Sequence, residues 1–333
     1  MSFYYEKLNL TEKKIYDNIV SNIINMKTTT PCTGVGDIKA MFADIMGSHP
    51  QFYYVNNQCG VSLGLTGKNI ILSYRYSKNQ LNETNSQIET VMQEIISANI
   101  NQHQSDYDKV LVLHDYLKKN IQYDWDAAIS MGMRGFEDSH NIVGAFLNKK
   151  CVCEGFAKAM KALCDKIGLE CLVVSGTACS SVAKGPHAWN IVKINGYYHH
   201  VDVTWDNQFT DDVTVPNYGY LNLDDETIGK DHTWNKNNYP LCPDDPYNYF
   251  RVNQSLIDSK TKLEKFFYES ILNEEEHIIF KVVKGSQLEK EIAGSLQDII
   301  HRASSKCRHV SVNGLKYNLI PEQLTYMVQP KYQ

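Results

Sequence analysis

Residues 150–157 read KCVCEGFA and lead straight into an amphipathic helical pattern that Gly168 ends. Cys153 therefore lies at the N-terminus of the predicted helix. Unpaired N–H groups and the positive end of the helix dipole favour a thiolate at such a position, and the same N–H groups can donate to an oxyanion. Gly155 allows backbone or substrate to approach the first turn closely. This stretch predicts a nucleophilic cysteine.

The other cysteines have a weaker case as functional residues. Free cysteine is often a small buried apolar residue, and Cys164 and Cys171 fit that description because they fall in an apolar helix face and an apolar strand. Two interpretations of Cys151 stay open. It packs in the core, or it is a second thiol able to form a redox pair with Cys153. The remaining thiols are interpreted as structural, namely Cys32, Cys59, Cys179, Cys242 and Cys307.

The second informative stretch is residues 186–206, PHAWNIVKINGYYHHVDVTWD. Asn-Gly at 195–196 between two apolar runs is a strong signal for a two-residue type I′ hairpin turn. Counting outward from this turn places His187 opposite Thr204, so that His187 and Asp202 are diagonal neighbours on one face, about 7–8 Å apart at Cα. A three-residue loop with a bulge would put His187 and Asp202 on opposite faces.

Together the two stretches supply the three parts of nucleophilic catalysis. Cys153 is the activatable thiol, His187 the base, and Asp202 the group that orients the base and fixes its tautomer. A lone histidine beside a tryptophan, or a lone aspartate at a strand end, is more often a packing or capping residue, so the prediction depends on all three. His199 and His200, across the turn, are the competing candidates for the base.

The chain resembles the bacterial transglutaminase-like proteins of clostridial type. Three motifs carry the resemblance: V-C-x-G-[YF]-A at a helix start, H-A-W-N in a strand, and V-D-x-[TS]-W in a strand. The similarity extends over residues 110–242 and includes HDYL at 114–117 and DHTW at 231–234. The sequence departs from the family pattern at Cys151, where Ala or Gly is usual, and at Phe156, where Tyr is usual.

This resemblance implies a papain-like α+β fold and Cys–His–Asp chemistry on a carboxamide or peptide bond. It places Cys153, His187 and Asp202 on the nucleophile, the base and the orienting acid of the family. Transglutaminase-like proteins include proteases, peptide N-glycanases and inactive binding modules, so the reaction class is shared more widely than the substrate. The paired C-x-x-C motifs of the peptide N-glycanase branch do not occur in this sequence.

We predict three regions along the chain: an N-terminal helical plus hairpin accessory unit at residues 1–104, a transglutaminase-like catalytic core at 105–250, and a small C-terminal α+β domain at 251–333. In the N-terminal half, the residue patterns predict helices from Thr11 and from Asp37, strands at 60–66 and 69–76 joined at Gly67 and Lys68, and helices at 86–100 and from Ser105. In the C-terminal region, they predict a helix at 260–272, a strand at 277–283, a helix at 288–301, and strands at 309–312 and 317–319.

Composition and charge argue against several classes of function. The chain has 333 residues and a net charge of −5 without Lys/Arg-rich runs, so neither nucleic acid nor a membrane is an expected partner. No export signal or membrane span is recognisable, and the nine cysteines, an odd number, fit a reducing compartment, so we expect a cytoplasmic location. Removal of a leader before Met1 would leave the same sequence, so secretion stays open. With only a lone C-x-C and no acidic calcium loop, we expect no metal and no cofactor.

The expected function is that of a cysteine-dependent acyl-transfer or hydrolytic enzyme: a transglutaminase, a deamidase or a protease. The thiolate attacks an amide carbonyl, ammonia or an amine leaves, and the thioester passes to water or to an acceptor amine. The expected partners are a protein or peptide substrate and, for transfer, an amine. The alternative is a non-catalytic transglutaminase-like protein-interaction module that keeps the fold.

Overall fold

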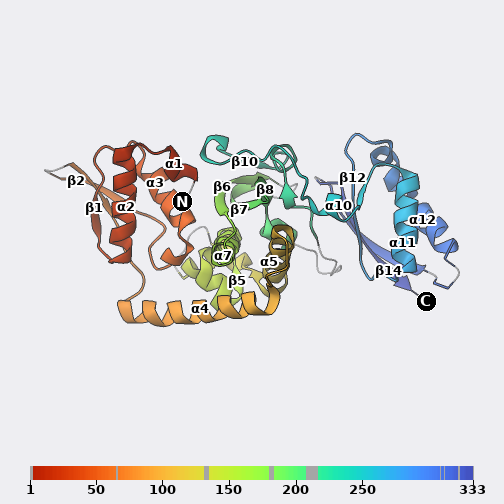
Figure 1. Ribbon diagram of the computed structural model, residues 1–333, viewed down its shortest axis with the longest axis horizontal. Helices are drawn as coiled ribbons and strands as arrows, with labels where there is room; N and C mark the ends of the chain where they lie inside the picture. Colours follow the sequence, from red (N-terminus) through yellow and green to blue (C-terminus); the bar gives the residue numbers. More distant parts are fainter. Residues whose placement is uncertain are drawn as a thin grey trace. The chain divides into compact units, whose positions relative to one another are not determined.

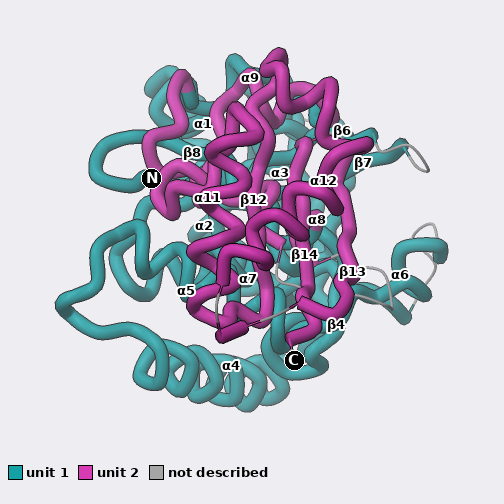
Figure 2. The backbone as a smooth tube through the Cα atoms, turned by 90° about the vertical axis from the view of Figure 1, so that its right-hand side faces the viewer, with its two compact units in different colours: residues 1–204, 232–242 teal, residues 205–231, 243–333 magenta. Residues whose placement is uncertain are grey.

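A mixed α+β fold, as predicted, is seen in the computed structural model, which describes residues 3–64, 67–130, 135–179, 184–207, 217–307, 309–310, 312–321 and 323–332. The chain forms two units, which Figure 2 shows in different colours: residues 1–204 with 232–242, and residues 205–231 with 243–333. The predicted boundaries at 104/105 and 250/251 stay predictions.

Helices of the first unit begin where polar side chains can cap them. Asn9 and Ser105 each form a capping box with the residue three positions later, and the Asp37 carboxylate accepts from Ala40 N at 2.9 Å. These helices, labelled in part in Figure 1, are α1 (Phe3–Lys7), α2 (Leu10–Ile24), α3 (Ile38–Ser48), η1 (Pro50–Phe52), α4 (Lys78–Asn99), α5 (Asp106–Asn120), α6 (Trp125–Ile129), η2 (Glu137–His140), η3 (Gly144–Asn148), α7 (Cys153–Lys166) and η4 (Lys236–Asn238).

Strands of the first unit form three groups. The first is a small sheet in the order β1 (Thr29–Pro31), β3 (Gly67–Ile71), β2 (Gly60–Gly64). The second is the parallel pair of β4 (Gln122–Tyr123) and β5 (Lys150–Cys151). The third is an antiparallel run in the order β10 (His232–Trp234), β6 (Cys171–Cys179), β7 (Lys184–Ile194), β8 (Tyr197–Val201), against which α7 packs. This run and α7 carry the candidate site.

The hairpin of β7 and β8 has the predicted turn. Asn195 and Gly196 both have positive φ, at 48° and 92°, which is the type I′ conformation, and Ile194 pairs with Tyr197. The predicted continuation of the second strand is wrong. β8 ends at Val201, and residues 203–207 form helix α8 (Val203–Asn207), so His187 has no strand partner at Thr204.

The departure into α8 has a local cause. The side chains that follow the strand find partners away from the ladder: the Trp205 ring packs edge-on against Tyr220 at 4.9 Å, and the Asp206 carboxylate accepts from Tyr220 N at 3.0 Å. These contacts stabilise a turn of helix at residues 203–207 in place of continued strand pairing with β7.

Two N-terminal predictions also need correction. Helix α4 begins at Lys78, well before residue 86, because Ser77 forms a capping box with Gln80 ahead of a polar first turn. Gly67 and Lys68 lie inside β3 and do not form the connection between β2 and β3, and Gly64 pairs with Gly67. The connecting residues 65–66 lie outside the described part of the chain.

The second unit is a sheet covered on one face by two helices. The sheet has the order β11 (Leu256–Ile257), β12 (Ile278–Val282), β14 (Thr325–Tyr332), β13 (Val312–Ile320), and the helices are α11 (Lys260–Leu272) and α12 (Gln287–Ser305). Apolar residues from both helices and from β12 form its core. Three further short elements are β9 (Leu221–Leu223), α9 (Asp225–Ile228) and α10 (Tyr249–Val252).

Most C-terminal elements match the sequence patterns, but two strands do not. β13 starts at Val312 and runs through the predicted 317–319 segment, so the separate strand expected at 309–312 is wrong for residues 309 and 310. β14 was not predicted at all, because Pro330 and polar residues interrupt its alternation, yet it pairs with both β12 and β13.

Among the described residues, no helix is both long and apolar enough to cross a bilayer.

Helix α7 can approach its neighbours only because residue 155 is glycine. A Cβ at Gly155 would lie 2.5 Å from Cys151 Cβ and 2.7 Å from Ser139 O. We predict that Gly155→Ala lowers the free energy of unfolding by about 1–3 kcal/mol, because a methyl group forced into a packed site displaces its neighbours. Gly294→Ala in α12 is the matched control: nothing lies within 4 Å of its Cβ position, so this variant should be as stable as wild type or slightly more. Thermal and urea unfolding of both variants test this, and an unchanged melting temperature for Gly155→Ala would contradict it.

Candidate active site

The nucleophile candidate, Cys153, is the first residue of α7. The preceding strand is fixed on one side by β4, where Tyr123 pairs with Cys151, and on the other by Ser139, whose carbonyl accepts from Val152 N at 2.9 Å. Val152 is the N-cap residue in extended conformation and gives no side-chain cap. The first-turn N–H groups of α7 thus have no N-cap side chain competing for them, which suits an oxyanion.

Asp124 holds the two segments that lead to Cys153. Its carboxylate accepts from Ser139 Oγ at 2.5 Å and from Ala127 N at 3.1 Å, and it lies 3.1 Å from Lys150 Nζ. Burial works to raise the pKa of Asp124, but these hydrogen bonds and the Lys150 charge lower it. An ionised Asp124 therefore ties the 137–140 turn and β5 together ahead of the helix.

Cys151 is packed against that helix. Its side chain is fully buried, and burial together with the neighbouring Cys153 and Asp124 raises the pKa of its thiol well above the ordinary value. Its Cβ fills the space that a side chain at Gly155 would need. These observations favour the packing interpretation of Cys151 over the redox one.

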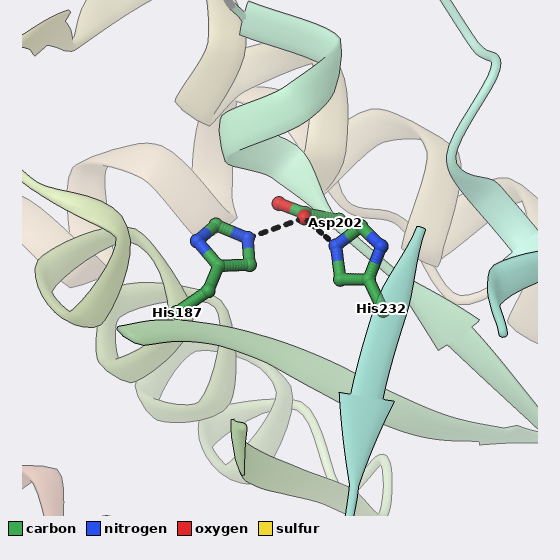
Figure 3. A group of neighbouring side chains, drawn as sticks. All are labelled: His187, Asp202 and His232. Atoms are coloured by element: carbon green, nitrogen blue, oxygen red, sulfur yellow. Dashed lines mark hydrogen bonds and ion pairs between the residues drawn. The ribbon is translucent and has the colours of Figure 1, made fainter. Parts of the chain in front are cut away.

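The base candidate His187 lies on β7 and reaches the Asp202 carboxylate. Its Nε2 donates to Asp202 Oδ2 at 2.6 Å (Figure 3), so the diagonal neighbours predicted from the turn do meet. The Cys153 thiol lies near enough to the imidazole to raise the pKa of His187, as Asp202 does. With Nε2 on the carboxylate, Nδ1 is the ring nitrogen that serves the thiol.

A second histidine shares the same carboxylate oxygen. His232, from β10, donates Nε2–H to Asp202 Oδ2 at 3.0 Å, and Figure 3 shows the carboxylate between the two imidazoles. Both the Asp202 and the His232 side chains are 0% exposed. His232 was not among the predicted site residues; the only signal for it in the sequence was the DHTW motif at 231–234.

The charges of this cluster are mutually dependent. Burial acts to lower the pKa of His187, but the Asp202 carboxylate, with a smaller contribution from Cys153, raises it to about 10. Burial acts to raise the pKa of Asp202, yet His187 and His232 hold it well below its ordinary range. An ionised Asp202 facing a protonated His187 is therefore the state that the surroundings favour at neutral pH.

Trp189 packs beside the cluster and forms a hydrogen bond with His200, one of the competing candidates for the base. Its ring lies 5.9 Å from that of His187 and 4.9 Å from that of His232, and its Nε1–H donates to His200 Nδ1 at 2.9 Å. His199 and His200 are both fully buried. His187, with its links to Asp202 and Cys153, is better placed to be the base than either.

Three of these groups also have the donor types of a metal site. Ligand atoms of His187, Asp202 and His232 lie within 4.8 Å of one another. At 2.6 and 3.0 Å, however, the nitrogen-to-oxygen contacts are hydrogen bonds, and a metal would have to displace both shared protons. The geometry thus favours a proton network, and the expectation of no metal stays a prediction.

A cavity opens beside the start of α7. It has a volume of about 750 Å³ and is bordered by Glu154, which directly follows Cys153. The Glu154 carboxylate contacts His140 Nδ1 at 3.2 Å and Lys158 Nζ at 2.7 Å. The rest of the wall comes from three segments: Val55, Asn56, Asn57, Gln58, Cys59 and Gly60 in the first, Ser73 and Arg75 in the second, and Phe136, Glu137 and His140 in the third.

Comparison with known proteins agrees with this arrangement. Residues 94–224, which include Cys153, His187 and Asp202, match the family model described as Transglutaminase-like superfamily. The chain has a transglutaminase-like core. The predicted α+β class with such a core is confirmed.

Curated relatives match a little over a third of this chain. Kyphoscoliosis peptidase of Mus musculus is 26% identical over 135 residues, covering 38% of this chain and 20% of that protein. Kyphoscoliosis peptidase of Homo sapiens is 26% identical over 131 residues, covering 37% of this chain and 19% of that protein. The match therefore spans about a fifth of the length of these relatives.

Two solved structures are also similar. A transglutaminase (TGase) has a TM-score of 0.34 and 14% identity, with 53% of this chain and 50% of that chain covered. A candidate cysteine protease from Cytophaga hutchinsonii has a TM-score of 0.29 and 14% identity, with 45% of this chain and 63% of that chain covered.

The His187–Asp202 pair predicts a particular dependence of stability on pH. Because the pKa of His187 is raised from an ordinary value of about 6.5 to about 10, the charged imidazole stabilises the fold fully below pH ~6.5 and progressively less as pH rises through about 10. We predict that His187→Gln, which leaves Asp202 buried without its cation, costs about 3–5 kcal/mol at neutral pH. The difference from wild type should shrink as the pH approaches 10. Urea unfolding at a series of pH values tests this, and a difference that stays constant from pH ~7 to ~10 would contradict it.

Proposed function

We propose that this chain is a cysteine-dependent acyl-transfer or hydrolytic enzyme that acts on a carboxamide or peptide bond. Cys153 is the nucleophile, His187 the general base, and Asp202 the group that orients the base. The observation that carries the proposal is the hydrogen bond of 2.6 Å between His187 Nε2 and the Asp202 carboxylate, with Cys153 near enough to the same imidazole to raise its pKa.

The chemistry divides into two half-reactions. The proton of the Cys153 thiol passes to His187, which gives a thiolate beside the protonated imidazole that Asp202 favours. The Cys153 sulfur then forms a bond to the carbonyl carbon, and the N–H groups of the first turn of α7 stabilise the oxyanion. The carbon–nitrogen bond breaks, and His187 protonates the departing ammonia or amine. Water or an acceptor amine then attacks the thioester and loses its proton to His187, which gives an acid or a new amide and restores the thiol.

The proposed substrate is a protein or peptide. The cavity of about 750 Å³ beside Glu154 offers room for residues that flank the reacting side chain or bond. Residues 55–60, which belong to the proposed N-terminal accessory region, line it, so we assign to that region a role in substrate choice. The relatives described above are named peptidases, which supports attack on a peptide bond.

Two broader assignments complete the proposal. We place the chain in the bacterial, clostridial-type branch on the three motifs already described. The cysteines are not joined by disulfide bonds in the described part of the chain, which fits action in a reducing compartment such as the cytoplasm.

The first test compares the reactivities of two thiols. We predict that iodoacetamide at neutral pH modifies the half-buried Cys153 faster than the exposed Cys179, because only Cys153 has the helix terminus and the His187 base. Tryptic mass spectrometry after limited labelling gives both rates in one sample. Faster labelling of Cys179, with Cys153 unmodified in folded protein, would contradict the assignment of Cys153 as the nucleophile.

The second test measures the reaction itself. Incubation with a glutamine-containing peptide and a labelled amine should change the peptide mass by the value for deamidation, amine transfer or cleavage, and Cys153→Ala should abolish the change. Cys307→Ala, which removes another half-buried thiol in the second unit, is the matched control and should stay active. A folded protein with a reactive Cys153 that turns over no peptide in a broad library would favour the non-catalytic interaction module.

His232 should act as a positioning residue for Asp202. Loss of a hydrogen bond to a charged group costs about 1.5–3 kcal/mol, so we predict that His232→Phe slows Cys153 alkylation by about 10- to 100-fold. His232→Gln, which keeps an N–H donor, should recover part of the rate. Equal rates for the two variants, with unchanged pH profiles, would show that His232 only fills space.

A further inference from the structure

The second unit contains a basic cavity away from the residues proposed for catalysis. Its volume is about 210 Å³, and its wall includes four cationic side chains and one carboxylate: Lys230, Arg251, Lys281, Lys284 and Asp245. All of them belong to the second unit. The protein as a whole carries a net charge of −5, so this concentration of positive charge is local.

Lys281 is the inner residue of this cavity. It lies on β12 between Phe280 and Val282, which face the core under α11 and α12, so alternation along the strand directs Lys281 to the other face of the sheet. Its Nζ donates to Gln323 Oε1 at 3.0 Å and lies 5.8 Å from the centre of the Phe250 ring. Gln323 is itself buried and is held by Asp231 through a hydrogen bond of 3.3 Å.

The charge of Lys281 is only partly compensated by its neighbours. Burial and the like charge of Lys230 lower the pKa of Lys281 to about 8, although Asp245, Asp224 and Asp206 act in the opposite direction. Within the described part of the chain, no carboxylate lies within 4.0 Å of its Nζ. Lys281 is partly buried, and a partly desolvated ammonium group without a close carboxylate is stabilised when a further anion joins it.

The other cationic residues of the wall do not bring a carboxylate close to the Lys281 ammonium group. Arg251 pairs with Asp245 at 2.6 Å and so occupies the carboxylate of the lining. Lys230 and Lys284 are exposed and have no ion pair among the described residues. The cavity therefore presents several ammonium donors to any small group placed inside it.

We propose that this cavity is a binding site for a small oxyanion of phosphate size, with the partly buried Lys281 as the anchor and the more exposed Lys230 and Arg251 beside it. Its size suits one tetrahedral anion better than a polymer, and ammonium and guanidinium groups are the usual protein donors to phosphate oxygens. The site is independent of the proposed cysteine chemistry, because none of its residues belongs to the Cys153 cluster.

The test is binding of inorganic phosphate to the full chain, measured by calorimetric titration against chloride at equal ionic strength. We expect saturable binding of one phosphate, at least tenfold weaker in Lys281→Met and several-fold weaker in Lys230→Ser. Lys316→Ser, which removes an exposed lysine on β13, is the matched control and should bind as wild type does. Because Lys230 is exposed, its variant keeps the test decisive if Lys281→Met does not fold.

A chemical readout locates the anion. Phosphate should slow acetylation of Lys281 by acetic anhydride by at least severalfold, and leave acetylation of Lys316 unchanged. Citrate in place of phosphate tests whether carboxylates compete for the same residues; protection of Lys281 by either anion supports the site. The proposal is overturned by a lack of saturable binding, by equal affinity of the Lys230→Ser and Lys316→Ser variants, or by equal protection of both lysines.

Discussion

One buried carboxylate organises the candidate active site. Asp202 is 0% exposed and accepts hydrogen bonds from His187 and His232 on the same oxygen, at 2.6 and 3.0 Å. Transfer of an ionised carboxylate into a protein interior costs several kcal/mol, so these two bonds are needed to keep the group charged where it lies. In return, the charge of Asp202 fixes the orientation of His187 and favours its protonated form.

The fold brings the members of this cluster together from distant parts of the sequence. β7 supplies His187, the end of β8 supplies Asp202, and β10, separated from β8 by about thirty residues, returns along β6 to supply His232. Glycine permits the close approach: a Cβ at Gly176, opposite His187, would lie 2.3 Å from Thr233 O and 2.8 Å from the Trp189 ring. Helix α7 then brings Cys153 to the imidazole.

Local chemistry explains which parts were predictable. The type I′ turn at Asn195 and Gly196 sets the register of β7 and β8, so the pairing up to Asn190 and Val201 followed from counting. Asp202 comes directly after this ladder, and its contact with His187 is made beyond the last pair. Capping side chains likewise gave the starts of α3 and α5. The match of residues 94–224 to a transglutaminase-like model agrees with the family suggested by the motifs.

Long-range contacts explain what sequence reasoning missed. His232 joins the site through pairing of β10 with β6, and no spacing rule links it to Asp202. Helix α8 replaces the expected strand because Trp205 and Asp206 contact Tyr220, fifteen residues away in the chain at most. β14 lacks a clean alternation and becomes a strand only between β12 and β13.

The central claim is that Asp202 fixes the proton of His187 on Nε2, leaving Nδ1 for the Cys153 thiol. Proton and nitrogen NMR of the protein labelled with ¹⁵N-histidine measures this directly. We predict strongly downfield protons on Nε2 of both His187 and His232 at neutral pH, with both signals lost or shifted upfield in folded Asp202→Ala. A His187 Nε2 that carries no proton, or one whose proton signal is unaffected by Asp202→Ala, would contradict the account.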